Sequence, residues 1–248
     1  MSLRRAWLMA MAFAVSWSWL THAASVTVNP VRVHLSEAAP GQSLSVYNTG
    51  AVVARFQVKA YAWQQSTSGE MELSPTSDLA IFPTLLQIDP GQTRRIRITS
   101  GAASPAREQT YRIFIEELPP LQRDPAQAIQ MLTRFGIPIF LQPKAPVAHP
   151  RLRIAAAKKK VVLSLDNSGN SYFVAQTVEV EGRSRDGKRL FQQSLPAWYV
   201  LAGGLRQYEV PIADGACAEL GEVSATTTTD HGNLEARIDI GAGSCSNE

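Results

Sequence analysis

Residues 81–98 read IFPTLLQIDPGQTRRIRI, and residues 111–120 read YRIFIEELPP. The first stretch is an apolar run that ends in the turn signal DPGQ and resumes with isoleucines at alternate positions. The second stretch alternates in the same way and closes in a Pro-Pro pair. Apolar alternation with a period of two, punctuated by proline and glycine, is typical of short strands joined by turns. These stretches therefore predict β-structure.

The same alternation extends on both sides of them. It gives about seven strands in ~120 residues with no convincing helical period, which is the pattern of an Ig-like sandwich. At Asn29-Pro30 the phase slips, because the valines at 26 and 28 are even and those at 31 and 33 are odd. A proline removes a ladder donor, and a slip of one residue turns the apolar side to the other face. We expect this strand to serve two sheets in succession.

A proline-rich stretch divides the chain. Residues 143–150 read PKAPVAHP, with three prolines in eight residues, which indicates a stiff linker and a domain boundary. Beyond it the alternation resumes. We expect an all-β protein with an N-terminal Ig-like domain at residues 24–143, a linker at 144–150 and a smaller Ig-like domain at 151–248.

The first 23 residues predict a secretory signal peptide. Arg4 and Arg5 precede an apolar run from residue 6 to residue 20, and Thr21-His22-Ala23 places small residues at the −3 and −1 positions. The alternative is a membrane anchor, for which the run is short against a span of ~20 residues. The sequence therefore predicts export.

Export places Cys217 and Cys245, the two cysteines of the chain, in an oxidising compartment. A disulfide between them is then the default, and it should stabilise the second half by roughly 3 kcal/mol. The alternative is a metal pair, but no histidine stands at ligand spacing from either cysteine.

Composition and motifs exclude several classes of function. Cleavage after Ala23 would remove two of the 24 basic residues and none of the 21 acidic ones, which leaves a net charge of about +1 and no electrostatic footprint for nucleic acid. The chain has no nucleophile elbow, phosphate-binding loop, zinc-protease helix or dinucleotide fingerprint. We expect no catalytic residues, no cofactor and no metal site.

Taken together, these elements resemble the periplasmic pilus chaperones, the PapD-like family of chaperone–usher systems. Residues 83–97 are similar to that family's P-x-x-x-x-x-x-P-G-Q-x-x-x-x-R stretch, and residues 111–120 to its strand ending in E-x-P-P. Residues 137–143, IPIFLQP, resemble its strand closing in I-x-F-x-x-P, and residues 167–172, NSGNSY, resemble an element of its second domain. The resemblance covers the chain from about residue 25 to residue 245.

The resemblance implies two Ig-like domains set at an angle, with a cleft between them. It implies a periplasmic chaperone that holds an incomplete pilus subunit by lending it a strand, then delivers it to an outer-membrane usher. The implied partners are therefore pilus subunits and the usher, with no membrane-embedded segment, and an exposed donor strand could also pair with its copy in a dimer. The leading alternative is an exported Ig-like adhesion or cell-surface binding protein.

The donor strand is expected near residues 127–135, where one parity carries Ile129, Met131, Thr133 and Phe135. A donor strand must offer unpaired backbone groups and an apolar side chain at every second position. In the family the groove-filling residues lie just upstream of I-x-F-x-x-P, as these do. Thr133 would fill its pocket of the subunit groove poorly. The alternative is that this parity faces its own core.

The family also grips the subunit's C-terminal carboxylate with two basic residues. Arg32 falls at the first position, and a charge-assisted bond to a carboxylate suits arginine; the alternative is a surface arginine on an edge strand. The family's second residue is a lysine where this chain has Pro138, which cannot act. The resemblance leaves Arg134 as the expected substitute and Arg112 as the other candidate.

Overall fold

The computed structural model describes residues 26–101, 104–120, 131–157 and 159–241. The predicted signal peptide, Ile129 and Cys245 lie outside these residues. The elements of the first half are β1 (Val26–Asn29), β2 (Val33–Leu35), β3 (Gly41–Asn48), β4 (Ala54–Gln65), β5 (Met71–Pro75), β6 (Leu79–Phe82), β7 (Leu85–Ile88), β8 (Thr93–Ser100), β9 (Gln109–Glu117) and β10 (Arg134–Leu141).

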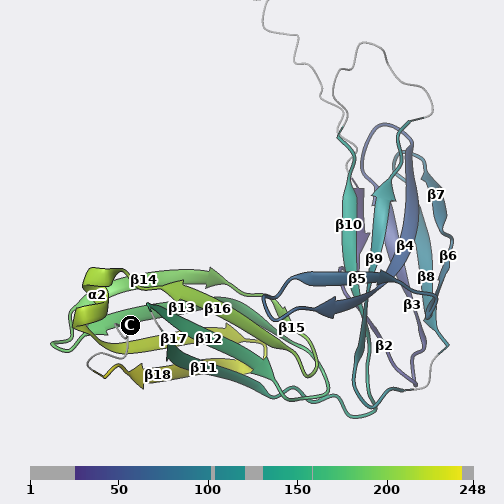
Figure 1. Ribbon diagram of the computed structural model, residues 1–248. Coiled ribbons are helices and arrows are strands. Elements are labelled where there is room, and N and C mark those ends of the chain that lie inside the picture. The colour runs from purple at the N-terminus through teal and green to yellow at the C-terminus, as the bar shows by residue number, and fades with distance from the viewer. Residues whose placement is uncertain (1–25, 102–103, 121–130, 158, 242–248) are drawn as a thin grey trace, which may run out of the picture.

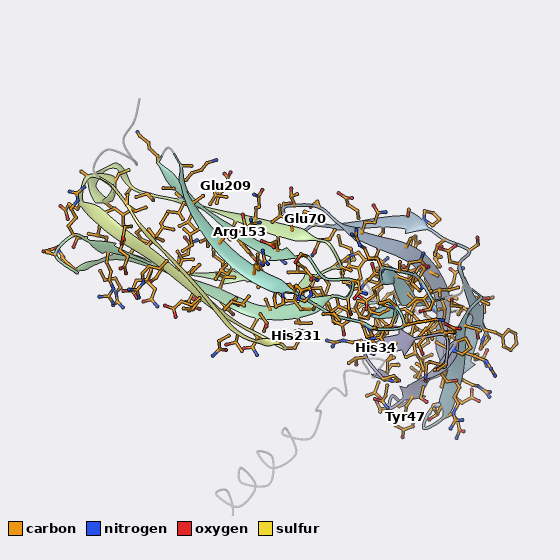
Figure 2. The ribbon with its side chains drawn as sticks, turned by 90° about the horizontal axis from the view of Figure 1, so that it is seen from below. His34, Tyr47, Glu70, Arg153, Glu209 and His231 are labelled. Carbon is orange, nitrogen blue, oxygen red and sulfur yellow. The ribbon has the colours of Figure 1, made fainter. Side chains whose placement is uncertain are left out.

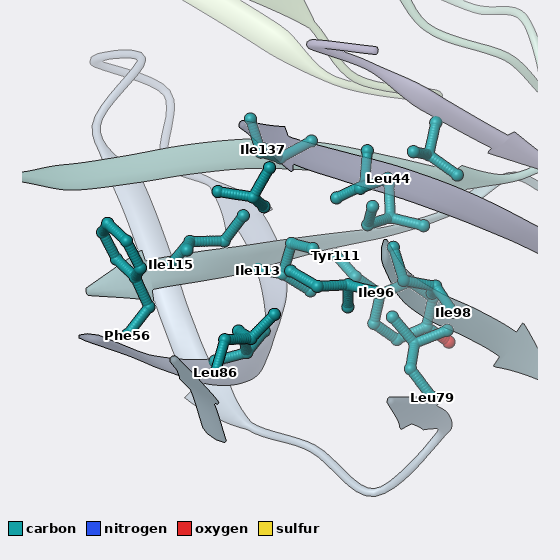
Figure 3. Packing of buried hydrophobic residues seen from close by; sticks show 14 of the residues in the cluster. Leu44, Phe56, Leu79, Leu86, Ile96, Ile98, Tyr111, Ile113, Ile115 and Ile137 are labelled. Atoms are coloured by element: carbon teal, nitrogen blue, oxygen red, sulfur yellow. The ribbon is translucent and has the colours of Figure 1, made fainter. Parts of the chain in front are cut away.

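The first half forms a sandwich of two sheets. One sheet has the order β1-β3-β8-β6, and the other has the order β2-β10-β9-β4-β5 with β7 also paired to β4. The alternating apolar residues of β8 and β9 face inward, so that Ile96, Ile98, Ile113 and Ile115 are completely buried. Figure 3 shows them packed together with Leu44 and Phe56.

The chain changes sheets at the slip in its first strand signal. β1 pairs antiparallel with β3 in one sheet, and β2 pairs parallel with β10 in the other. The prediction that one stretch serves two sheets in succession is confirmed. The parallel pairing places β2 beside β10, the last strand of the same sandwich.

The second half forms another sandwich, from β11 (Pro150–Ala157), β12 (Lys160–Asn167), β13 (Phe173–Ser184), β14 (Arg189–Pro196), β15 (Tyr199–Val200), β16 (Leu205–Pro211), α2 (Asp214–Glu219), β17 (Leu220–Thr229) and β18 (Gly232–Asp239). Its sheets have the orders β11-β12-β16 and β14-β13-β17-β18, with β15 paired to β13. Their inward residues form a separate core. Cys217 is buried and disulfide-bonded, while its predicted pairing with Cys245 stays a prediction.

The two sandwiches are set at an angle to one another (Figure 1). The last strand of the first ends at Leu141 and the first strand of the second begins at Pro150, so we keep the proposed division at residues 144–150. A cavity of about 480 Å³ lies where they meet, lined by β4 and the start of β9 on one side and by residues 201–204 on the other.

The predicted fold class is confirmed. Among the described residues, no helix has the length and apolar character needed to cross a membrane.

Candidate functional site

Aromatic side chains from both sandwiches form one buried cluster at their junction. We call it the interdomain aromatic cluster; its residues are Trp63, Phe140, Tyr172, Trp198 and Tyr199. Phe140 stacks on Tyr172 with ring centroids 3.9 Å apart, and Trp63 meets Tyr199 edge-on at 5.4 Å. Such pairs add to the stabilisation that burial of the rings provides. The cluster therefore provides apolar and aromatic contacts that join the two sandwiches.

Hydrogen bonds from Asn167 explain why the second sandwich presents its two tyrosines together. The buried Asn167 amide group donates to the carbonyl oxygens of Ser171 at 2.8 Å and Val200 at 3.2 Å. Its Oδ1 accepts the N–H of Gly169 at 3.0 Å. The side chain thus ties the loop before Tyr172 to the strand that carries Tyr199.

The β4–β5 hairpin makes a second connection between the sandwiches. The Gln65 amide group donates to the Tyr199 carbonyl oxygen at 2.9 Å, and the N–H of Gln207 donates to the Thr67 carbonyl oxygen at 2.7 Å. Figure 2 shows Glu70, at the tip of this hairpin, and His34 in the region where the sandwiches meet. The hairpin therefore fixes the backbone of Tyr199 from the side of the first sandwich.

Strand register brings the basic candidates to one level of the sheet. Val33 is opposite Ile139, and Pro138 is opposite Arg112, so Arg32, one residue before Val33, falls level with Pro138. Neighbours directly across a sheet point to the same face. Arg32 and Arg112 consequently flank Pro138 on the face of the sheet that meets the aromatic cluster.

Arg32 is held by the two tyrosines of the second sandwich. Its Nε donates to the Tyr199 hydroxyl at 3.0 Å, and its Nη1 donates to the Tyr172 hydroxyl at 3.1 Å. Its guanidinium carbon lies 5.2 Å and 5.6 Å from the centroids of the same rings. Burial acts against the charge, but the two tyrosines outweigh it and raise the pKa of Arg32, so the group stays a cation.

His34 extends this network on the same face. Its Nε2 lies 3.0 Å from the Tyr172 hydroxyl, and its ring stacks on Phe140. Because the Tyr172 oxygen accepts from Arg32, its O–H can donate to a neutral His34. Burial, and then the charge of Arg32, lower the pKa of His34, which favours this neutral form.

Arg112 is nearly buried, with 8% of its surface exposed. Its guanidinium carbon lies 5.0 Å from the Trp63 centroid and 4.7 Å from that of Trp198. Its Nη2 donates to the Gly136 carbonyl oxygen at 3.3 Å, and a β-carbon at Gly136 would lie 3.2 Å from its Nε. Burial lowers the pKa of Arg112. Because Gly136 has no side chain, β10 leaves room for the Arg112 side chain.

The ion pairs found in the described part of the chain include neither Arg32 nor Arg112. Arg134 differs, because it pairs with Glu116 at 2.9 Å and lies over the Phe114 ring. It stands four residues from Pro138, about 13 Å along the strand. Of the three predicted anchor residues, the structure brings Arg32 and Arg112 together at the aromatic cluster and places Arg134 elsewhere.

Glu108 is a further residue of the junction, and the sequence reasoning missed it. Its carboxylate accepts the Ser171 hydroxyl at 2.9 Å and the N–H of Tyr172 at 3.0 Å. Only 6% of the residue is exposed. Burial raises its pKa from 4.5 to about 7, against the opposite effect of the two hydrogen bonds.

The aromatic cluster could not be predicted from the sequence either, because nothing in a period-two pattern shows which rings meet across two domains.

The predicted donor segment leads into β10 from an exposed position. Met131 is 91% exposed, and Thr133 exchanges hydrogen bonds with Glu117, its N–H reaching the carboxylate at 3.0 Å. Phe135, by contrast, packs against the core of its own sandwich. β10 pairs with β9 from Arg134 to Leu141 but with β2 only from Ile139 onwards. Within the described part of the chain, residues 134–138 therefore have one unpaired strand edge.

Comparison with known proteins agrees with this architecture. Residues 25–147 match the family described as pili and flagellar-assembly chaperone, PapD N-terminal domain. No curated protein sequence matches the chain.

Solved structures of similar fold cover most of the chain. The chaperone–tip adhesion subunit pre-assembly complex CsuC–CsuE of Acinetobacter baumannii matches with a TM-score of 0.60 and 17% identity over 86% of this chain and 98% of that one. The Salmonella enterica SafA pilin in complex with the SafB chaperone matches with a TM-score of 0.55 and 19% identity over 89% and 98%. The E. coli chaperone DraB matches with a TM-score of 0.52 and 21% identity over 88% and 98%. At sequence identities this low, the structural similarity supports the fold alone.

Proposed function

The chain belongs, through its N-terminal domain, to the PapD-like family of pili and flagellar-assembly chaperones, and we propose that it captures pilus subunits in the periplasm by donor-strand complementation. In this proposal it then delivers them to an outer-membrane usher. Members of the family are chaperones, which are a non-enzymatic kind of protein. The predicted leader at residues 1–23 supports export but lies outside the described residues.

The observation that carries the proposal is the unpaired edge of β10 at residues 134–138, together with the exposed segment that precedes it. A sandwich that lacks a strand exposes a groove into its core and two unpaired edges, both of which favour aggregation. An open strand edge can pair with such a partner through its backbone. The side chain of Met131, 91% exposed in this chain, would gain roughly 1.5–3 kcal/mol on burial in the groove before the costs of association.

We assign the groove-filling role to Ile129, Met131 and Thr133. Phe135 has the same parity, but its contact with its own core suits it to fixing the start of β10. The segment therefore has a fixed end at Phe135 and an exposed apolar side chain further out.

We assign the carboxylate anchor to Arg32 and Arg112. They flank Pro138, the place of the family's lysine, on one face of the sheet, and no carboxylate of the described residues neutralises either one. A carboxylate at the end of a subunit strand laid along β10 would meet both charges. An arginine offers such a group two parallel N–H donors.

The experiment is a pull-down of the tagged protein from periplasm that also contains its pilus subunits. The wild type should copurify with a small β-rich subunit in about equal amounts, and the Ile129→Asp/Met131→Asp variant should be folded but alone. Leu132→Asp is the matched control, since Leu132 is 46% exposed but has the opposite parity. Equal yields from the wild type and the double variant would reject the donor assignment.

A wild-type protein that purifies alone would instead favour the alternative of an exported adhesion protein. If it purifies alone as a dimer that Ile129→Asp/Met131→Asp converts to a monomer, the same segment pairs with its copy in the free state.

A further inference from the structure

The second sandwich supplies the groups that hold Arg32. Arg32 carries five N–H donors, and two of its hydrogen bonds go to the Tyr172 and Tyr199 hydroxyls. Three N–H donors remain, one on Nη1 and two on Nη2. Nη1 and Nη2 form the side of the guanidinium that binds a carboxylate in bidentate geometry.

Each tyrosine is in turn fixed by the first sandwich. The N–H of Tyr172 donates to Glu108 at 3.0 Å, and its ring stacks on Phe140 at 3.9 Å. Tyr199 accepts from Gln65 through its carbonyl oxygen at 2.9 Å and packs edge-on against Trp63. The two hydroxyls therefore stand at fixed positions, and Arg32 is oriented without a partner protein.

The same rings connect Arg32 to the second cation. Tyr199 lies against Trp198, with ring centroids 5.0 Å apart, and Trp198 covers the guanidinium of Arg112. The faces of these rings attract both cations. In the described part of the chain, neither cation is neutralised by a carboxylate. An anion that binds Arg32 meets a cation already held in place, with the charge of Arg112 nearby, so little ordering has to accompany its binding.

We propose that Tyr172 and Tyr199 are positioning residues for the carboxylate anchor. Their hydroxyls accept from Nε and Nη1 of Arg32, which leaves three N–H donors on Nη1 and Nη2 for a carboxylate. The ligand is a terminal carboxylate, and the site is complete only when both sandwiches are in place. This inference rests on the anchor named in the proposed function.

The probe is acetate, compared with the neutral acetamide at constant ionic strength, on the full chain labelled with ¹⁵N. The readout is the Arg32 Nε–H resonance, assigned by its loss in Arg32→Lys. In the wild type, acetate should shift this resonance saturably and acetamide should not. In Tyr172→Phe/Tyr199→Phe, which keeps both rings, the half-saturating acetate concentration should rise at least tenfold.

Tyr47→Phe is the matched control, because Tyr47 is an exposed tyrosine of β3, which belongs to the sheet of the first sandwich that does not contain β2. It should respond to acetate as the wild type does. Backbone amide spectra of the tyrosine variants are the check on their fold; with the wild-type pattern retained, a weaker response in the double variant reports on Arg32 itself.

The outcomes separate the inference from the proposed function. If the double variant binds acetate as the wild type does, the positioning role is overturned while the anchor stands. If acetate does not shift Arg32 in the wild type, both the anchor and the positioning role are overturned. Subunit capture through β10 is decided independently by the pull-down.

Discussion

Replacing Glu108 by glutamine should stabilise the protein at high pH and leave its stability unchanged at low pH. The carboxyl group is buried between the sandwiches, and burial raises its pKa from the ordinary 4.5 to about 7. An acid whose pKa is higher in the folded protein binds more protons folded than unfolded between these two values. Its contribution to the free energy of unfolding therefore falls as the pH rises from 4.5 to about 7.

The size of the effect follows from the same two values. At 1.36 kcal/mol per pH unit, the interval corresponds to about 3 kcal/mol, lost in full above pH 7. Glutamine carries no charge and can keep both contacts, since its oxygen can accept the N–H of Tyr172 and its amide group can donate to the Ser171 hydroxyl. Glu108→Gln should thus match the wild type at pH 4.5 and exceed it by about 3 kcal/mol at pH 8.

The measurement is urea unfolding of both proteins at several pH values, expressed as the difference between them. That difference cancels His34 and other groups that titrate in both proteins. Glu70→Gln, which replaces an exposed glutamate at the tip of the β4–β5 hairpin, is the control for the effect of the substitution itself. The reasoning is refuted if Glu108→Gln differs from the wild type by the same amount at both ends of the range, or is less stable at pH 8.

Two other predictions concern the anchor and the second sandwich. Gly136→Ala should weaken subunit capture roughly tenfold, about 1.4 kcal/mol, because the new β-carbon would lie 3.1 Å from Phe114 and 3.2 Å from Nε of Arg112 and would force them to shift. Gly101→Ala, whose β-carbon meets nothing within 4 Å, is the comparison, and equal capture by the two variants would contradict the role of Arg112. Reducing the disulfide at Cys217 should lower the stability of the second sandwich by about 3 kcal/mol, measured by hydrogen exchange. Equal losses of protection in both sandwiches would argue against this local effect.

Much of the fold could be predicted from short-range pattern. The period-two alternation gave the strands because successive residues of a strand point to opposite faces wherever the strand lies. The slip at Asn29-Pro30 gave the change of sheet for the same reason. The family followed from the order of several local motifs, which needs no knowledge of tertiary contacts.

The choice of Arg112 as the second cation of the proposed anchor could not be made in this way. Arg134 is only four residues from Pro138 in the chain, but in an extended strand this spacing places the two residues about 13 Å apart. The Arg134 side chain also pairs with Glu116. Arg112 is far away in the chain, yet strand pairing places it directly opposite Pro138. Only register decides such neighbours, and register is a property of the assembled sheet.

The sequence by itself determined an all-β protein, the switch of its first strand between sheets and its resemblance to a chaperone family, because each depends on patterns within a few residues. The tertiary structure alone decided that rings from two domains enclose Arg32 and Arg112 and that Glu108 lies buried between the domains. Those contacts join residues far apart in the chain, and a carboxylate or guanidinium takes its properties from whatever surrounds it after folding.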